Sequence, residues 1–280
     1  MKPDIIVLLL ITTVPAMVLA QGGMPPLGLV AATLLGGVLA AGGANAVNCY
    51  LDRDIDEVMA RTRGRPVPSR RVEPGHALGF GLGLIAASFA WLWPAVNVLA
   101  AVLALAAAAF YTVVYTVWLK RSTPQNIVIG GAAGAVPVLV GWAAVTGTLS
   151  LPAWVLFAIV FYWTPPHFWA LAMRYAGDYE AARVPMLPVL RGRRETAVTI
   201  LLYSLLLVAV SLLLYPVGRM GGVYLGAAVG LGALFVGHAV RVLRDPGTRA
   251  AMALFRYSIT YLGLLFAAVA VDRLVLGVGA

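Results

Sequence analysis

The sequence predicts an all-α, polytopic membrane protein, in which residues 1–280 form one domain with nine transmembrane helices. Hydrophobic residues make up 61% of the chain and charged residues only 11%, and the mean hydropathy is +0.92. A soluble domain averages about 25% charged residues. Apolar runs of about 20 residues, long enough to cross a bilayer, recur along the whole chain. The single cysteine, Cys49, excludes an internal disulfide and a cysteine-based zinc site.

The nine predicted spans are apolar segments that contain Gly and Pro, which membrane helices tolerate. The first, IIVLLLITTVPAMVLA, is similar to the core of a signal peptide. Its basic flank consists of Lys2 alone and no small-x-small motif closes it, so we expect a retained helix. The predicted spans are 5–20, 28–51, 77–95, 97–118, 126–146, 152–172, 197–217, 222–240 and 255–277.

The basic residues predict the orientation of the chain. Of the 20 Lys and Arg residues, all except Arg219 and Arg273 fall on one side of the membrane if there are nine spans. The positive-inside rule makes this side cytoplasmic, with the N-terminus inside and the C-terminus outside. The net charge of +9 therefore reflects mainly topology, and no nucleic-acid partner is expected.

The acidic residues indicate where the chemistry lies. Of the 11 Asp and Glu residues, all except Asp272 fall on the same cytoplasmic side, and they cluster in the two longest loops. The positive-inside rule does not require acids, so these loops, which follow the second and sixth spans, are the predicted functional segments.

Three polar residues at the end of the second span predict a metal site. Asn48, Asp52 and Asp56 are spaced i, i+4 and i+8, so on a helix they share one stripe about 12 Å long. Carboxylates held together at a membrane edge need a partner cation. Mg²⁺ takes oxygen ligands and leaves positions for water and substrate phosphate. A solvated helix end with Asp–Arg pairs is the alternative interpretation.

The arginines after this stripe indicate a phosphate site. Arg61, Arg63 and Arg65 carry planar guanidinium groups that suit phosphate oxygens. Pro66 and Pro68 would stiffen the loop that carries them. Carboxylate-bound Mg²⁺ with arginines nearby is typical of a pyrophosphate site, although orientation accounts for some of these charges.

The motif N-x-x-x-D-x-x-x-D, followed by a second acidic loop, resembles the UbiA-type intramembrane prenyltransferases. The stretches NCYLDRDIDEVMARTRGRPVPSRR, YTVWLKRSTPQNIVIGGAAGAVP, WTPPHFWALAMRYAGDYEAARVPMLPV and LFRYSITYL are more narrowly similar to the protohaem IX farnesyltransferase (haem O synthase) branch. The resemblance covers nearly the whole chain. It implies a helix bundle around a central cavity, open to lipid on one side and capped by the acidic loops, in a bacterial or archaeal cell membrane.

The resemblance also implies a reaction, which is Mg²⁺-dependent transfer of a farnesyl group from farnesyl diphosphate to a vinyl group of haem b, with addition of water. A haem A synthase or a terminal oxidase assembly partner would then be expected to take the product. By motif, the metal ligands would be Asn48, Asp52, Asp56 and Asp178. Lys120 and Arg121 match the basic pair that binds pyrophosphate, and Asp52, Asp56 and Lys120 are the expected catalytic residues.

One position departs from the superfamily pattern. The second motif is usually D-x-x-x-D, but after Asp178 the matching position is Ala182. The resemblance to the haem branch implies this loss. Glu180 is out of phase, and its role in holding a second Mg²⁺ stays open.

The chemistry itself requires an apolar cavity. Mg²⁺ and Lys or Arg would stabilise the departing pyrophosphate, and the allylic cation must be kept from water. Aromatic side chains on the spans are candidates to shield the cation, although packing or interfacial placement is the commoner role for any one of them. These candidates are Tyr111, Tyr115, Phe161, Tyr162 and Trp163.

His167 is the notable histidine, because it lies inside the sixth span in TPPHFW. Pro165 and Pro166 predict a broken or kinked helix here. A polar residue inside a span is a functional candidate, so His167 is either an axial ligand of haem iron or a partner of a freed carbonyl. His76 and His238 are expected to be ordinary residues at the membrane edge.

Two other functions share some of these features. A prenyltransferase acting on a quinone or chlorophyll precursor would share the metal site, and TPPHFWALA favours haem over it. An ion-coupled transporter would carry acids at mid-span and broken-helix repeats. Here the acids lie near the span edges, which disfavours transport.

Overall fold

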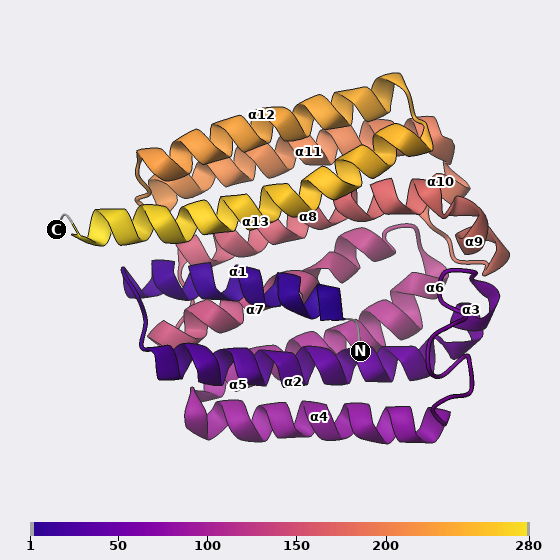
Figure 1. Ribbon diagram of the computed structural model, residues 1–280, viewed down its shortest axis with the longest axis horizontal. Helices are drawn as coiled ribbons and strands as arrows, with labels where there is room; N and C mark the ends of the chain where they lie inside the picture. Colours follow the sequence, from indigo (N-terminus) through magenta and orange to yellow (C-terminus); the bar gives the residue numbers. More distant parts are fainter. Residues whose placement is uncertain (1–2, 279–280) are drawn as a thin grey trace.

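The computed structural model describes residues 3–278, with side chains from 11 to 275, and within this range every regular element is helical (Figure 1). The basic flank Lys2 lies outside the described residues. The all-α prediction is confirmed. The chain folds as a bundle of long helices that run roughly side by side, joined at one end by several short helices.

Eight helical segments are long and apolar enough to cross a membrane. They match the second to ninth predicted spans. The first predicted span corresponds to α1 (Pro3–Gln21), whose described apolar part, Ile11–Gln21, is shorter, so the total of nine spans stays a prediction. The eight are α2 (Leu27–Leu51), α4 (Pro74–Ala95), the continuous run α5 (Val98–Ala109), η1 (Phe110–Leu119) and α6 (Lys120–Ser122), α7 (Asn126–Thr146), α8 (Leu151–Arg174), α11 (Gly192–Val217), α12 (Gly222–Arg244) and α13 (Thr248–Val278).

The long helices form two groups joined by α1 and α7. In one group α2 packs on α4 and α4 on α5, and in the other α8, α11, α12 and α13 pack on one another. Helix α7 contacts α1, α5 and α8, and Figure 1 shows α1 and α7 between the two groups. This arrangement leaves room for a cavity whose walls come from both groups.

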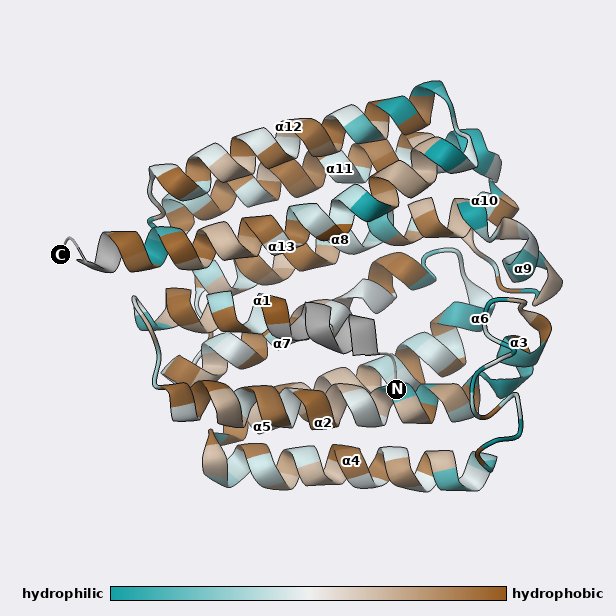
Figure 2. Ribbon diagram, in the orientation of Figure 1, coloured by the Kyte–Doolittle hydropathy of each residue, from teal (hydrophilic) through white to brown (hydrophobic). Residues whose placement is uncertain are grey.

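The polar residues gather at one end of the bundle. Figure 2 shows hydrophilic colouring around the short helices α3 (Arg53–Val58), α6, α9 (Ala176–Ala181) and α10 (Leu187–Leu190). The two acidic loops meet there, because the backbone N–H of Arg61 donates to Asp178 Oδ2 at 3.4 Å. Loops distant in sequence therefore form one polar cap over the bundle.

Close contact between α2 and α4 depends on glycine. A Cβ atom at Gly43 would lie 2.6 Å from the carbonyl oxygen of Gly81, and one at Gly81 would lie 2.8 Å from that of Gly43. Small residues let membrane helices approach at backbone distance. The pair therefore fixes the spacing of the helix that ends in the acidic stripe.

The predicted break in the sixth span does not occur. Helix α8 runs from Leu151 to Arg174 without interruption through Pro165 and Pro166. Neighbouring helices can hold a proline-containing membrane helix together, and α8 packs on α7, α11 and α13. His167 therefore lies inside a continuous helix.

Candidate active site

Asn48, Asp52 and Asp56 form a buried line at the polar end of the bundle. Helix α2 ends at Leu51, and Asp52 joins it to α3. The backbone bonds Asp52 N to Asn48 O, 2.9 Å, and Asp56 N to Asp52 O, 2.8 Å, keep the helical spacing across the junction. The three side chains therefore stay in phase, each is about 1% exposed, and all three line one cavity.

Both carboxylates are paired with cations that also line the cavity. Asp52 Oδ2 lies 2.5 Å from Lys120 Nζ and accepts a hydrogen bond from Asn48 Nδ2 at 2.8 Å. Arg65 Nη1 donates to both carboxylate oxygens of Asp56, at 2.9 Å to Oδ1 and 2.7 Å to Oδ2. Because these pairs are buried, removing one partner would leave an uncompensated charge. The alternative interpretation was a solvated helix end with Asp–Arg pairs. An Asp–Arg pair is present between Asp56 and Arg65, but its carboxylate is buried rather than solvated.

One carboxylate oxygen fits a further cation. Asp52 Oδ1 is enclosed and has no hydrogen-bond partner in the described part of the chain, and Arg121 Nη2 is 4.0 Å away. Asn48, Asp52 and Asp56 offer only oxygen ligands of the kind Mg²⁺ prefers. Among the described residues, however, no three His, Cys, Asp or Glu side chains converge as a metal cluster, so Asp178 is not gathered with Asp52 and Asp56.

The predicted phosphate-binding cations divide into two sets. Arg61, Arg65 and Lys120 line the cavity. Arg63 is exposed, and neither Arg63 nor Arg121 is part of this lining. The structure therefore brings three of the five predicted cations together and leaves two outside.

Arg121 instead secures the outer side of the cap. Its guanidinium donates to Asp54 through two hydrogen bonds of 2.7 Å and to the Leu51 carbonyl at 3.0 Å. The hydrogen bond from Arg121 lowers the pKa of Asp54 from 3.8 to about 2. The stability from this pair is therefore fully present above about pH 4 and is lost as the pH falls through about 2.

A π-helical segment, η1, delivers Lys120 to the acidic line. Its wider turn is seen in the backbone bond from the Lys120 N–H to the Tyr115 carbonyl, five residues back. The Thr116 hydroxyl donates to the Tyr111 carbonyl at 2.8 Å. Thr116 Oγ1 also accepts from Asn48 Nδ2 at 3.0 Å. π-Helical turns are rare and often occur at functional sites. Thr116 lies in the stretch YTVWLKRSTPQN noted above, but nothing in the sequence marked it as a site residue, and only the structure shows its contact with Asn48.

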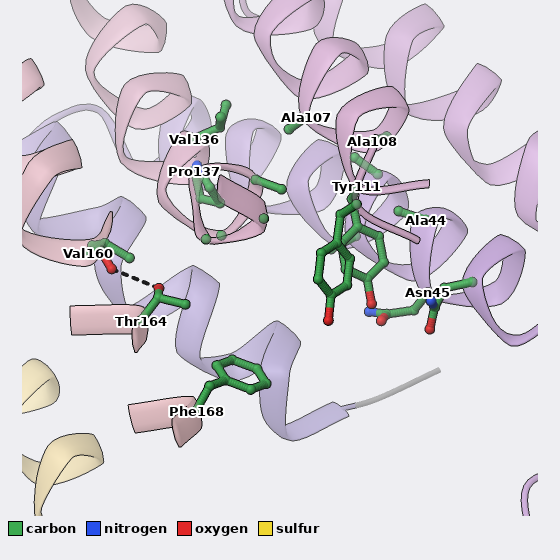
Figure 3. A pocket seen from close by; sticks show the side chains of 18 of the residues that line it. Ala44, Asn45, Ala107, Ala108, Tyr111, Val136, Pro137, Val160, Thr164 and Phe168 are labelled. Atoms are coloured by element: carbon green, nitrogen blue, oxygen red, sulfur yellow. Dashed lines mark hydrogen bonds between the residues drawn. The ribbon is translucent and has the colours of Figure 1, made fainter. Parts of the chain in front are cut away.

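The cavity has a volume of about 330 Å³ and extends from this polar end into the bundle. Figure 3 shows its wall, in which small residues such as Ala44, Ala107 and Ala108 face Thr164 and Phe168 of α8. A wall of small, mostly apolar side chains suits a hydrocarbon chain. The charged line at one end and this wall together can hold an amphipathic molecule.

Three of the five aromatic candidates lie at the cavity. Tyr111, Tyr115 and Trp163 line the cavity, and the rings of Tyr111 and Tyr115 stack at 5.5 Å. Phe161 and Tyr162 lie outside the lining and pack on the hydrophobic core, because the turn of α8 directs them away. Phe168 and Tyr179 also line the cavity, and neither was a candidate from sequence. Burial raises the pKa of the Tyr179 hydroxyl, which therefore stays neutral near Arg61.

The three histidines have different surroundings. His167 lines the cavity, and its Nδ1 lies 2.7 Å from Ser258 Oγ on α13, so it does not bond a carbonyl freed by the prolines. His76 is exposed beside Glu73, at 3.4 Å, and His238 stacks on a tyrosine ring of α13. Only His167 is placed to contact a bound molecule in this cavity.

The chain resembles known prenyltransferases along most of its length. The sequence profile of the UbiA prenyltransferase family matches residues 9–269. A protein from Gloeobacter violaceus named protoheme IX farnesyltransferase is 56% identical over 277 residues, covering 98% of this chain and 90% of that protein. One of the same name from Synechocystis is 54% identical over 275 residues, covering 98% and 87%.

Solved structures share the fold at low identity. A UbiA homolog from Aeropyrum pernix K1 superposes with a TM-score of 0.72 at 20% identity, covering 98% of both chains. A UbiA homolog from Archaeoglobus fulgidus bound to GPP and Mg²⁺ gives a TM-score of 0.65 at 15% identity, covering 94% of this chain and 96% of that one. These matches agree with the helical bundle described above.

Proposed function

Because the chain belongs to the UbiA prenyltransferase family and is a membrane prenyltransferase, we propose that it transfers a farnesyl group from farnesyl diphosphate to a vinyl group of haem b, giving haem O and diphosphate. The observation that supports a diphosphate donor is the buried line of Asn48, Asp52 and Asp56, paired with cations at the polar end of an apolar cavity. The names of relatives more than 50% identical over nearly the whole chain support haem b as acceptor.

The diphosphate would bind at the polar end. Lys120, Arg65 and Arg61 would donate to its oxygens and offset the negative charge that grows as the C1–O bond of the donor breaks. Asn48, Asp52 and Asp56 would hold Mg²⁺, and Asp178, which accepts from the Arg61 N–H, would keep the facing loop beside them. When bound, Mg²⁺ would supply Lewis-acid stabilisation of the leaving group. The enclosed, unsatisfied Asp52 Oδ1 supports this assignment.

The apolar part of the cavity would protect the reacting carbons. The haem vinyl group attacks C1 of the farnesyl group, which forms a carbon–carbon bond as diphosphate leaves. The cation left on the inner vinyl carbon takes up water, which loses a proton to give the hydroxyl of haem O. The stacked rings of Tyr111 and Tyr115 would stabilise the allylic cation, and the apolar wall would exclude water until the bond has formed.

Incubating the purified protein with haem b, farnesyl diphosphate and Mg²⁺ tests this function. Mass spectrometry should find haem b plus one farnesyl group and one hydroxyl group, and chelating Mg²⁺ should abolish the product. Geranyl and geranylgeranyl diphosphates in parallel determine the preferred isoprenoid. Transfer to a quinone precursor but not to haem b would contradict the proposal and favour another aromatic acceptor.

The product also implies a partner in the membrane. Haem O carries a farnesyl tail and is poorly soluble, so direct transfer to a membrane-bound haem A synthase or to an assembly factor of a terminal oxidase is expected. Crosslinking in native membranes followed by mass spectrometry tests this expectation.

A further inference from the structure

The imidazole of His167 is fixed on three sides. The rings of Trp163 and Phe255 stack on it at centroid distances of 4.3 and 4.6 Å, and because one face cannot hold both rings, they cover both faces. Ser258 Oγ covers the edge at Nδ1, at 2.7 Å. Phe168 also contacts the ring edge-on, at 5.4 Å. His167 nevertheless lines the cavity and Nε2 is not among the fully enclosed atoms that lack a bond, so part of the edge that carries Nε2 reaches the cavity.

The protons of this pair can be counted. Ser258 Oγ lies 2.6 Å from the Phe255 carbonyl, which can only accept, so the single hydroxyl proton is directed there. Nδ1 of His167 must then donate its own proton to Ser258 Oγ. No ion pair involves this ring in the described part of the chain, and a buried imidazole without a counter-ion is held neutral. A neutral imidazole has one N–H, so Nε2 keeps its lone pair.

The other ring nitrogen, Nε2, is not bonded to any of the residues that the structure describes, and it is not one of the fully enclosed polar atoms that lack a bond. The serine itself is well anchored, because Trp163 Nε1 donates to the Ser258 carbonyl at 2.7 Å and ties α8 to α13. The lone pair is therefore held in a fixed direction into the cavity.

We propose that Ser258 is a positioning residue that keeps His167 in the Nδ1–H tautomer, so that Nε2 is the axial ligand of the metalloporphyrin substrate. This inference rests on the proposed function. Histidines that bind metals usually donate their other ring N–H to an acceptor that fixes tautomer and orientation. Ligation to iron would hold the porphyrin in one orientation, and the two stacked aromatic rings would keep the ligand from turning.

Titration of ferric haem b into the purified full-length protein, without diphosphate, tests the proposal by absorption and electron paramagnetic resonance spectra. The wild type should show histidine ligation. His167→Gly should lose it, and added imidazole should restore it. Ser258→Ala should weaken haem binding about 10- to 100-fold, whereas Ser258→Thr, which keeps the hydroxyl, should bind nearly as the wild type does. Ser204→Ala is the matched control, because Ser204 is buried and bonds only within its own helix.

The outcomes separate this inference from the proposed function. An unchanged spectrum in His167→Gly, or no rescue by imidazole, would overturn the ligation. Unchanged haem affinity in Ser258→Ala, or loss in a folded Ser258→Thr equal to that in Ser258→Ala, would overturn the role of the hydroxyl. Farnesyl transfer is measured separately: transfer without any effect of His167 or Ser258 refutes only the inference, whereas haem ligation without transfer to haem refutes the proposed function.

Discussion

At the residue scale, the site depends on carboxylates that are buried in pairs with cations. Asp52 and Asp56 are enclosed with Lys120 and Arg65, whereas their neighbour Asp54 is exposed and paired with Arg121. The three aspartates alternate along the chain, yet only two face the cavity. Their different positions make a matched comparison possible.

We predict that Asp52→Asn lowers turnover by about 100-fold or more, because it removes a negative charge that would hold the Mg²⁺ bound to the leaving diphosphate. Asp54→Asn, which changes an exposed carboxylate, should reduce turnover far less. Farnesyl transfer to haem b at saturating Mg²⁺ is the measurement, with thermal unfolding as a check on folding. Equal losses in the two variants would contradict a special role for the cavity-facing aspartate.

The residue scale also shows what the sequence could predict. Asn48, Asp52 and Asp56 share a face because of local helical spacing, which is readable from sequence. The conformation of the following loop decides which of its arginines enters the cavity. The spacing of Arg63 and Arg65 in the sequence does not show that Arg65 enters and Arg63 does not. Likewise the contact of Lys120 with Asp52 spans 68 residues and needs the packed bundle.

At the element scale, η1 explains how a lipid-facing helix contributes polar groups to the site. Its exposed residues Val113, Val117 and Trp118 lie on the outside of the bundle, whereas Thr112 and Thr116 are buried. The apolar run predicted the span but not its π-helical segment. Hydropathy does not indicate whether each backbone N–H bonds the carbonyl four or five residues back. The uninterrupted α8 is the opposite case, in which tertiary packing overrides the local preference of two prolines.

We predict that Thr116→Val lowers turnover and raises the Mg²⁺ concentration needed for half-maximal activity, because Asn48 loses the hydroxyl that orients its amide. Thr112→Val is the matched control, since among the described residues the Thr112 hydroxyl bonds only the carbonyls of Ala108 and Ala109. Activity measured across a Mg²⁺ titration separates the two variants. If the two titration curves coincide, the placement of Asn48 by η1 has no functional consequence.

At the scale of the whole molecule, the bundle separates a polar cap from an apolar interior. Eight spans and the all-helical class follow from hydropathy, because bilayer thickness dictates helix length. The meeting of the two acidic loops could be expected only from the resemblance to the family, since no local pattern links residues more than 100 positions apart. The orientation of this cap in the membrane remains a prediction.

We predict that the cap faces the cytoplasm, because nearly all Lys and Arg residues lie on its side. In a Cys49→Ser background, Thr148→Cys should react with an impermeant maleimide on intact cells, whereas Glu73→Cys should react only after permeabilisation. Both positions are exposed loop residues on opposite sides of the predicted topology. The reverse labelling pattern would invert the assignment.

The last prediction concerns the length of the isoprenoid that the cavity accepts. Gly134 lines the cavity, and a Cβ atom built there meets no protein atom within 4 Å, so a larger side chain would project into open space. Gly134→Leu should therefore disfavour farnesyl relative to geranyl diphosphate, shifting the ratio of their kcat/KM values by about tenfold, since one or two lost methylene contacts are worth this much. Gly226→Leu, at a helix glycine that is also free of neighbours but lies outside the cavity lining, is the control and should leave the ratio unchanged. A Gly134→Leu variant that loses activity equally with both diphosphates would mean that this part of the wall does not contact the isoprenoid.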